Sequence, residues 1–343
     1  MQNPKEPIHS GPVLSISLDW TIGGIKTNKR DLFSYPKDLA VDPEGNVYVL
    51  DSLDRAVKKY DQAGRFVWSI GRTGQGPGEF QGIPYGLSYH PLAKSLMVMD
   101  PAGRLSWFLP DGGFIRSVKL SQGIVFSALC DSAGKIYLRK DAQDGTHRLI
   151  VLDAEGRGVL SEIMKIPQKS GGNPFGPYGS WTIDAMDSLI YGFGEPYELQ
   201  VFDSGGRLIR KIVKLYDPVR IPKFMLDKYR ATDVPPGLTL PRVTRTHMPA
   251  FGNFFVDDRG RLFVHTWDGT SEGREELYDI FDADGRFFGR VSLNLRFYRD
   301  GHVCVLRKDK LYALEEGEEE VGIVRRYSVR WLVKEGENAR PVR

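Results

Sequence analysis

Short apolar stretches alternate with polar turns along the chain, and one group of four stretches shows the pattern most clearly. Pro36–Asp42, Gly45–Asp51, Val57–Asp61 and Arg65–Gly71 are rich in β-branched and aromatic residues and are separated by Asp and Gly. Apolar–polar alternation over four to eight residues, bounded by turn residues, indicates β-strands. The pattern therefore predicts four antiparallel strands in this segment.

The turn between the last two of these strands has a sequence that recurs, Asp-x-x-Gly-Arg after an apolar or aromatic residue. It begins at Asp61, Asp153, Asp203 and Asp282, and a degenerate copy occupies residues 109–113. Spacings of one or two times roughly 40 to 50 residues indicate an array of similar units. We expect the Asp to accept hydrogen bonds from nearby backbone N–H groups and the Gly to take a positive φ. We therefore interpret these aspartates as turn residues and not as catalytic groups.

Further units follow the same order. We expect them at residues 84–120, 124–166, 181–215, 249–293 and from about 295 onward. The last unit is predicted with 301–305 as its second strand and 323–327 as its third, and it has no fourth strand of its own. Ser17–Gly23, however, matches Arg65–Gly71 with an offset of 48 residues. An N-terminal strand that completes the last unit would remove two exposed sheet edges. The predicted fold class is therefore all-β, a six-bladed β-propeller of four-stranded antiparallel blades closed by the N-terminal strand.

The repeat also predicts the domain organisation. A single propeller is expected over residues 13–332, between a flexible N-terminal tail, 1–12, and a C-terminal tail, 333–343. Two insertions interrupt it, at 168–180 and 216–248. The first is rich in Gly and Pro and is predicted to be an irregular loop. The second contains Pro222–Arg230, a short helix with Pro in its first turn, and insertions of this length often carry function.

One unit boundary carries a more specific motif. Gly74–Phe80 reads Gly-Gln-Gly-Pro-Gly-Glu-Phe and is followed by Pro84-Tyr85-Gly86-Leu87. This run resembles the NHL repeat, and the chain is similar over most of its length to bacterial six-bladed NHL-like propellers, which are often exported or lipid-anchored. The other unit boundaries depart from the motif. The resemblance implies a fold and does not imply an activity.

The candidate binding residues follow from this fold. Loops that join one unit to the next share one end of the blades with the loops between second and third strands, and by analogy with other propellers we expect ligands there. Aromatic and cationic residues are common in these loops and suit sugars, anionic small molecules or peptide carboxylates, although long side chains of this kind also cover ordinary surfaces. The candidate ligand-binding residues are Arg72, Glu79, Phe80, Tyr85, Arg139, Lys140, Trp181, Arg245, His247, His265 and Trp267. The same loops also contain Asp51, Arg55, Asp100, Arg104, Glu195, Tyr197, Arg242 and Asp268.

Catalytic and metal motifs are not found in the sequence. It contains no Gly-x-Ser-x-Gly, phosphate-binding loop or Cys–His signature. A catalytic zinc site needs convergent imidazoles, whereas His147, His247 and His265 come from different units or from an insertion. Calcium needs oxygen ligands, and among the residues that open the first strands of five units only Asp38 is acidic. We therefore assign no catalytic or metal-binding residue and expect no cofactor. A zinc- or calcium-dependent lyase or hydrolase is kept as the alternative function.

Composition changes this picture only slightly. The chain has 343 residues, 41% of them hydrophobic, and a net charge of +3. This charge is too small to favour nucleic-acid binding as the main function. RNA binding is therefore a second alternative. The acidic run at 315–320 is interpreted as a solvated loop. Cys130 and Cys304 are expected to be buried thiols that act as small hydrophobic residues.

Location and assembly are predicted less directly. No stretch reaches the 18 apolar residues that favour a membrane-spanning helix, and Met1–Pro7 has no apolar signal-peptide core. We expect a periplasmic or extracellular protein whose export signal is absent from this chain, with the cytoplasm as the alternative, and a monomer. The predicted function is that of a non-enzymatic NHL-like propeller which binds a small ligand or a protein partner through its loop face and central channel mouth.

Overall fold

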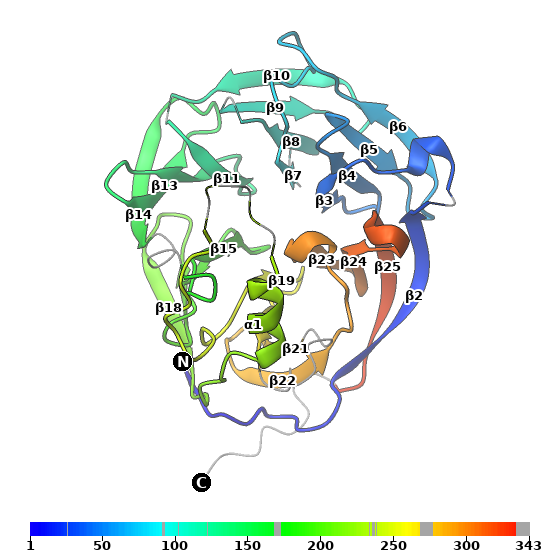
Figure 1. Ribbon diagram of the computed structural model, residues 1–343. Coiled ribbons are helices and arrows are strands. Elements are labelled where there is room, and N and C mark those ends of the chain that lie inside the picture. Colours follow the sequence, from blue (N-terminus) through cyan, green and yellow to red (C-terminus); the bar gives the residue numbers. More distant parts are fainter. Residues whose placement is uncertain are drawn as a thin grey trace. The chain divides into compact units, whose positions relative to one another are not determined.

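The computed structural model describes residues 1–25, 27–90, 93–101, 103–121, 123–167, 173–232, 234, 237, 239–267 and 277–333. Its strands build six four-stranded antiparallel sheets, so the predicted fold class, an all-β six-bladed propeller, is confirmed (Figure 1). The chain divides into two compact units. The first unit comprises residues 1–16, 167–295 and 329–343, and the second comprises residues 17–166 and 296–328. Most of the predicted C-terminal tail and residues 168–172 of the first insertion lie outside the described residues.

The second unit contains the first three sheets, apart from the last residue of β14, and in each sheet consecutive strands are neighbours. The first sheet contains β3 (Pro36–Val41), β4 (Val47–Asp51), β5 (Ala56–Tyr60) and β6 (Phe66–Ile70). The second contains β7 (Gly86–His90), β8 (Ser95–Met99), β9 (Arg104–Phe108) and β10 (Phe114–Lys119). The third contains β11 (Val125–Cys130), β12 (Ile136–Asp141), β13 (Thr146–Leu152) and β14 (Val159–Pro167). These strands lie in the predicted units.

The first unit contains the fourth and fifth sheets. The fourth sheet contains β15 (Ser180–Ile183), β16 (Leu189–Gly192), β17 (Glu198–Phe202) and β18 (Leu208–Lys214). The fifth contains β19 (Phe254–Val256), β20 (Leu262–Thr266), β21 (Leu277–Phe281) and β22 (Phe287–Ser292). Helix α1 (Lys223–Arg230) lies in the insertion between these sheets and begins after Pro222, as predicted.

The sixth sheet contains strands from both ends of the chain. Its order is β2 (Leu14–Gly23), β25 (Gly322–Trp331), β24 (Lys310–Glu316) and β23 (Cys304–Arg307). The N-terminal strand is therefore the fourth strand of this sheet, as the match to the first unit predicts. The boundary between the two compact units falls within β2 and within β25. Three short 3₁₀ turns, η1 (Lys29–Asp31), η3 (Tyr298–Asp300) and η4 (Glu318–Glu320), are also described.

The strand assignment within the sixth sheet corrects the sequence analysis. The segment expected as the second strand, 301–305, overlaps the first strand, β23, and the second strand is β24. These two strands are joined by Lys308 and Asp309, with φ of 50° and 55°, the positive values that a two-residue type I′ turn needs. No Gly marks this turn, so the signal used for the other hairpins is missing. Glu315, expected in a solvated loop, is 1% exposed in β24 and accepts a hydrogen bond from the Tyr327 hydroxyl at 2.6 Å.

The repeated Asp-x-x-Gly-Arg turn has the predicted geometry. In the first sheet, Asp61 Oδ1 accepts hydrogen bonds from the backbone N–H groups of Ala63 and Arg65, both at 2.9 Å. Gly64 has φ +77° and donates its N–H to the Asp61 carbonyl. The strand register shifts next to this turn, between Lys59 and Tyr60. A turn followed by a left-handed residue produces such a bulge, so the repeated sequence specifies both the turn and the bend of the strand.

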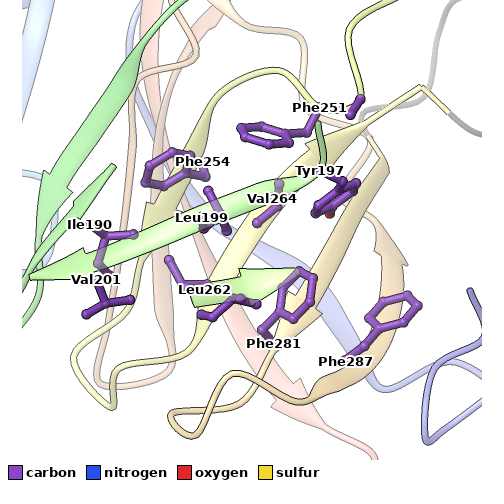
Figure 2. Close-up of a cluster of buried hydrophobic side chains, with 12 residues drawn as sticks. Ile190, Tyr197, Leu199, Val201, Phe251, Phe254, Leu262, Val264, Phe281 and Phe287 are labelled. Atoms are coloured by element: carbon purple, nitrogen blue, oxygen red, sulfur yellow. The ribbon is translucent and has the colours of Figure 1, made fainter. Parts of the chain in front are cut away.

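The core of the first unit lies between the fourth and fifth sheets (Figure 2). Leu199 from β17 and Val264 from β20 are fully buried there. Tyr197 is 1% exposed, its ring centroid lies 5.1 Å from that of Phe251, and its hydroxyl donates to Asp279 Oδ2 at 2.8 Å. Burial of one such large apolar side chain stabilises a fold by about 1.5 to 3 kcal/mol. The two sheets are therefore held together by apolar contacts that surround a satisfied polar group.

The first twelve residues, expected as a flexible tail, make regular contacts within the first unit. β1 (Gln2–Asn3) pairs in parallel with β18 as a fifth strand of the fourth sheet. Asn3 is 6% exposed, and its side chain donates to the Gly285 carbonyl at 3.0 Å and accepts from the Phe287 N–H at 2.8 Å. Further on, the Ile8 N–H donates to the Phe287 carbonyl at 3.0 Å. The segment thus bonds to the outer strands of two sheets, where a free tail was expected.

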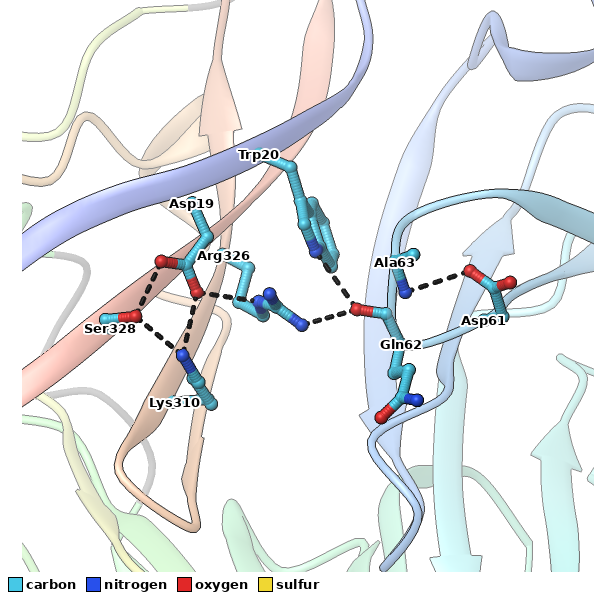
Figure 3. A network of polar contacts seen from close by, with 8 residues as sticks. All are labelled: Asp19, Trp20, Asp61, Gln62, Ala63, Lys310, Arg326 and Ser328. Atoms are coloured by element: carbon cyan, nitrogen blue, oxygen red, sulfur yellow. Dashed lines mark hydrogen bonds and ion pairs between the residues drawn. The ribbon is translucent and has the colours of Figure 1, made fainter.

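Side chains of the sixth sheet fix the N-terminal strand within the second unit (Figure 3). Asp19 of β2 accepts hydrogen bonds from Ser328 Oγ at 2.6 Å, Arg326 Nε at 2.9 Å and Lys310 Nζ at 3.1 Å. Arg326 also donates to the Gln62 carbonyl in the repeated turn of the first sheet. The N-terminal strand is therefore bonded both to its own sheet and, through Arg326, to the neighbouring hairpin.

Candidate binding site

The Gly-Pro-Gly-Glu-Phe loop is closed by its own side chains. Glu79 accepts a hydrogen bond from the Gly76 N–H at 2.9 Å and from Arg72 Nε at 2.7 Å. The Gly76 bond, followed by the Arg72 bond, lowers the pKa of the Glu79 carboxyl. Arg104 donates to the Gln75 carbonyl at 3.2 Å and to the Glu79 carbonyl. Arg72 and Glu79 are therefore brought together, but they bind each other and the loop.

Phe80 corrects the list of candidate ligand contacts. Its side chain is 1% exposed and packs in a core cluster of the first two sheets, with its ring centroid 6.0 Å from that of Phe108. The loop backbone returns here, since the Phe80 N–H donates to the Arg72 carbonyl at 2.8 Å. Aromatic character in a predicted loop suggested a surface contact, but the tight loop directs this ring into the core.

Tyr85 and Arg139 are also partly committed to packing. The Tyr85 hydroxyl donates to the Val125 carbonyl at the start of β11, so it links the second and third sheets. The Arg139 guanidinium lies 5.7 Å from the centre of the Phe126 ring, which in turn packs against His147 with centroids 4.3 Å apart. His147 has its pKa lowered by burial and by the charge of Arg139. This group lies on the opposite face of the third sheet from Lys140, because Arg139 and Lys140 are neighbours in one strand.

Acidic residues at the ends of second strands have a structural role. Asp51 is fully buried, accepts the Ser34 and Tyr35 N–H groups at 2.9 Å, and pairs with Lys58 at 3.0 Å. Asp100, 1% exposed, accepts the Gln81 N–H at 3.1 Å in the same way. These carboxylates attach the preceding interblade loop to the sheet. They were candidates for the binding face, and the structure accounts for them as loop anchors.

The five candidates of the first unit have different partners, and only His265 and Trp267 are shown with their side chains in contact. Arg245 pairs with Glu195 at 2.8 Å, and His247 Nδ1 lies 2.9 Å from Thr246 Oγ1. His265 and Trp267 contact each other edge to face, with centroids 4.6 Å apart, while Trp181 lies in β15 opposite Tyr191. Asp268, also named from the sequence, lies outside the described residues.

His265 is a buried residue rather than a surface ligand. It is 4% exposed, and its backbone carbonyl accepts the Gly252 N–H at 2.9 Å. A Cβ at Gly252 would lie 2.6 Å from His265 Nδ1, so only glycine lets the chain pass this ring. The imidazole is therefore enclosed by the fifth sheet and its entry loop.

The two insertions contact each other within the first unit. Asn173, 4% exposed, donates to Thr244 Oγ1 at 2.9 Å, and Phe175 packs edge to face on Tyr229 of α1 at 5.8 Å. The longer insertion has a short antiparallel stem, since the Ile221 N–H donates to the Thr246 carbonyl at 3.0 Å. The described parts of the two insertions therefore pack against each other.

The Lys140 hollow is a cavity of about 530 Å³ beside the third sheet, with a lining that extends from the β12–β13 loop at the predicted binding end to the start of β14. It opens where the link from the second sheet meets the β12–β13 loop and strands β13 and β14. Its lining residues are Ser121, Gly123, Ile124, Lys140, Asp141, Ala142, Gln143, Arg148, Ile150, Val159 and Glu162. Its volume lies in the range of about 300 to 1,000 Å³ that is typical of small-molecule sites.

Charges in the Lys140 hollow are unequally paired. Arg148 Nη1 donates to Glu162 Oε2 at 2.8 Å, whereas Lys140 makes no ion pair with any residue that the structure describes. Beside these charges, Ile124 and Val159 are 64% and 53% exposed. Asp141, the second acid of the lining, accepts the Gln143 N–H at 3.1 Å. The hollow therefore combines a lysine that makes no ion pair with the described residues and exposed aliphatic surface.

Of the predicted binding residues, only Lys140 lines this hollow. The sequence reasoning missed Ile124, Arg148, Val159 and Glu162. Residues 124 and 159 are apolar positions at strand starts, which the pattern assigned to the core, and Arg148 and Glu162 lie inside strands rather than in loops. Their proximity depends on the pairing of β13 with the outer strand.

Metal-binding clusters and membrane-spanning helices are both absent from the residues that the structure describes. No group of three His, Cys, Asp or Glu side chains suitable for a metal ion occurs in the described part of the chain. Among those residues, no helix is long and apolar enough to span a membrane. Cys130 is a free thiol, and burial raises its pKa to about 12.

Comparison with solved structures supports the fold. A candidate exported protein from Bacteroides fragilis has a TM-score of 0.60 and 12% sequence identity, covering 96% of this chain and 99% of its own. A member of the DUF4221 family from Bacteroides vulgatus has a TM-score of 0.58 and 14% identity, covering 93% and 99%. The chain matches no known protein-family model. At these identities the likeness establishes the fold alone, and the NHL type is not confirmed by it.

Proposed function

We propose that the protein is a non-enzymatic binding propeller and that the Lys140 hollow takes a small ligand with an apolar body and one anionic group. The observation that carries this proposal is the pairing pattern of the hollow, in which Arg148 is neutralised by Glu162 and Lys140 has no ion-pair partner among the described residues. A buried or half-buried cation attracts an anion, and hydrogen bonds to charged groups are worth about 1.5 to 3 kcal/mol.

The apolar part of the ligand would lie on Ile124 and Val159. Both side chains are more than half exposed and line the same cavity. Covering such surface contributes roughly 25 cal/mol per Å². A peptide with an apolar C-terminal residue also carries an anionic group, its carboxylate, next to an apolar side chain. The same site could therefore bind the C-terminus of a protein partner.

Binding without chemistry is supported by the state of the nearby carboxylates. Glu162 pairs with Arg148, and Asp144, in the adjacent turn, has its pKa lowered by the Thr146 hydroxyl and by Lys165. A general acid or base works best with a pKa near the operating pH. A carboxyl such as that of Asp144, whose pKa is lowered, suits a binding surface better than proton transfer.

We further propose an NHL-type propeller located outside the cytoplasm. The closed Gly-Pro-Gly-Glu-Phe loop supports the first part, and the structural likeness to a candidate exported protein supports the second. Fractionation of cells that express the full-length gene product tests the location.

The binding proposal is tested with hexanoate, which has a carboxylate and a short apolar chain. Ligand-detected NMR on the wild type should show binding, and neutral hexanamide should bind at least ten-fold more weakly. Lys140→Ala should weaken hexanoate binding about ten-fold. Lys119→Ala, which removes the same charge from the exposed strand β10, is the matched control and should bind like the wild type. Equal binding by Lys140→Ala, or no detectable hexanoate binding at millimolar concentration, would refute the site.

A further inference from the structure

The second unit has another cavity, of about 510 Å³, which we call the Arg116 hollow. It is lined by described residues on either side of the β7–β8 turn, by the β11–β12 turn, by strands β9 and β10, and by the β13–β14 turn. These turns join first to second and third to fourth strands, so they lie at the end of the sheets opposite the β12–β13 loop of the Lys140 hollow. Its lining residues are His90, Ala93, Ser95, Trp107, Ile115, Arg116, Ser132, Ala133, Gly134 and Ala154. The two hollows share no lining residue.

Arg116 is the charged group of this cavity. Its guanidinium stacks on the Trp107 ring, 4.2 Å from the ring centre, and one of its N–H groups donates to the Ala154 carbonyl. Trp107 is 5% exposed and belongs to the core cluster between the second and third sheets. Stacking on a buried ring fixes the plane of the guanidinium. The cation is therefore held in position before any ligand arrives.

The charge of Arg116 is not compensated locally. None of the described lining residues is Asp or Glu, and Arg116 makes no ion pair with the residues the structure describes. A guanidinium has five N–H donors in a fixed fork, and a single hydrogen bond to Ala154 leaves donors for a ligand. The cavity is therefore set up for an anion that accepts two hydrogen bonds side by side, as a carboxylate does.

The rest of the lining suits an apolar ligand body. Ile115 is 44% exposed beside Arg116, and the small side chains of Ala93, Ala133 and Ala154 leave the space open. The far wall is rigid, because His90 is 5% exposed and its Nδ1 accepts the Ala93 N–H at 2.9 Å. A flat or aliphatic group would thus cover Ile115 while its carboxylate meets Arg116.

We propose that the Arg116 hollow is a second binding site, which takes a small carboxylate with an aromatic or aliphatic body. This site goes beyond the proposed function, because it shares no lining residue with the Lys140 hollow.

Benzoate is the probe for this site, with benzamide as its neutral counterpart. Titration calorimetry on the wild type should detect benzoate, and benzamide should bind at least ten-fold more weakly. Arg116→Gln should reduce benzoate affinity at least ten-fold, since the lost interaction is a charge-assisted hydrogen bond. Because benzoate also matches the ligand proposed for the Lys140 hollow, the titrations are repeated in a Lys140→Ala background, where benzoate should still bind and Arg116→Gln should still cause the loss.

A second variant covers the case in which Arg116→Gln loses the stacking contact and folds poorly. Ile115→Glu changes an exposed position and places a carboxylate beside Arg116, so it should abolish benzoate binding while the circular dichroism spectrum stays unchanged. The control Arg65→Gln removes a guanidinium from an exposed turn and should have no effect. Undetectable benzoate binding to the wild type, equal affinity for benzamide, or wild-type affinity in a folded Arg116→Gln or Ile115→Glu variant would overturn the proposal.

Discussion

Aspartates next to the ends of strands have three different physical roles in the described sheets. In the repeated turn, Asp61 caps backbone N–H groups and stays partly exposed. In the turn between first and second strands, Asp42 is 2% exposed and also accepts a hydrogen bond from the Tyr48 hydroxyl at 2.9 Å. At the end of a second strand, Asp51 is fully buried and anchors a loop. The spacing of Asp and Gly in the sequence identifies the first role. The other two roles depend on which residues of the folded chain pack against the aspartate.

Asp38 shows how far a local environment shifts one group. Burial raises the pKa of Asp38 to about 7, against hydrogen bonds from the Leu87 and Leu39 N–H groups at 2.8 and 2.9 Å, which lower it. The folded chain therefore binds this proton more tightly than the unfolded chain, whose value is near 3.8. The stability that this group contributes is present at low pH and is lost as pH rises from about 4 to 7.

The first prediction follows from this shift. Asp38→Asn removes the titration but loses one acceptor, so the variant should be less stable than the wild type at pH 5. The wild type loses its proton as pH rises, so its free energy of unfolding should fall toward that of the variant. The difference between the two proteins should therefore shrink by up to about 2 kcal/mol by pH 8. Urea unfolding of both proteins at pH 5, 6, 7 and 8 measures it, and a difference that is the same at every pH would contradict the assignment.

At the scale of elements, turn chemistry decides where strands begin and end. Hairpins marked by Asp and Gly were predicted correctly, because glycine occupies a left-handed position, as at Gly260 with φ +78°. The β23–β24 hairpin was misassigned because Lys308 and Asp309 adopt positive φ without glycine. The strain of those residues is offset by pairing along β24, which no local pattern reports.

Gly260 tests the turn argument with little interference from packing. A Cβ there would meet the Ala283 Cβ at 3.6 Å, an ordinary contact, so the cost of a substitution is that of the backbone. Gly260→Ala should lower the free energy of unfolding by about 1 to 2 kcal/mol. Gly260→Asn should lose clearly less, because Asn tolerates this conformation. Thermal unfolding of the two variants checks the order, and equal losses would point to packing instead.

At the scale of the whole chain, the N-terminal strand is the fourth strand of a sheet whose other strands come from the C-terminal part. Asp19 and Arg326 are 307 residues apart in sequence and form an ion pair at 2.9 Å (Figure 3). Burial pushes the pKa of Asp19 upward, but the Ser328 hydrogen bond and the bonds and charges of Lys310 and Arg326 outweigh it, so the pKa lies below 3.8.

We predict that Asp19→Asn lowers the free energy of unfolding by about 1 kcal/mol at pH 7, the upper end for a largely solvated ion-pair network. The loss should disappear in acid, since the contribution of a carboxyl with a lowered pKa is present above its ordinary value and is lost as pH falls through the lower one. Asp217→Asn, which breaks one exposed pair with Lys5, is the control and should be neutral. Equal effects of the two substitutions in chemical unfolding would contradict this role.

The sequence by itself determined the repeat, the strands of five sheets, the turn geometry and the N-terminal strand of the sixth. These features depend on residues close in sequence, where alternation, Asp and Gly act directly on the backbone. Only the tertiary structure decided which loop residues remain accessible. It buried Phe80 and His265, turned Asp51 and Asp100 into loop anchors, and brought Lys140 beside Ile124 and Val159, and Arg116 onto Trp107. Burial and charge pairing depend on neighbours from other strands, so local pattern cannot report them.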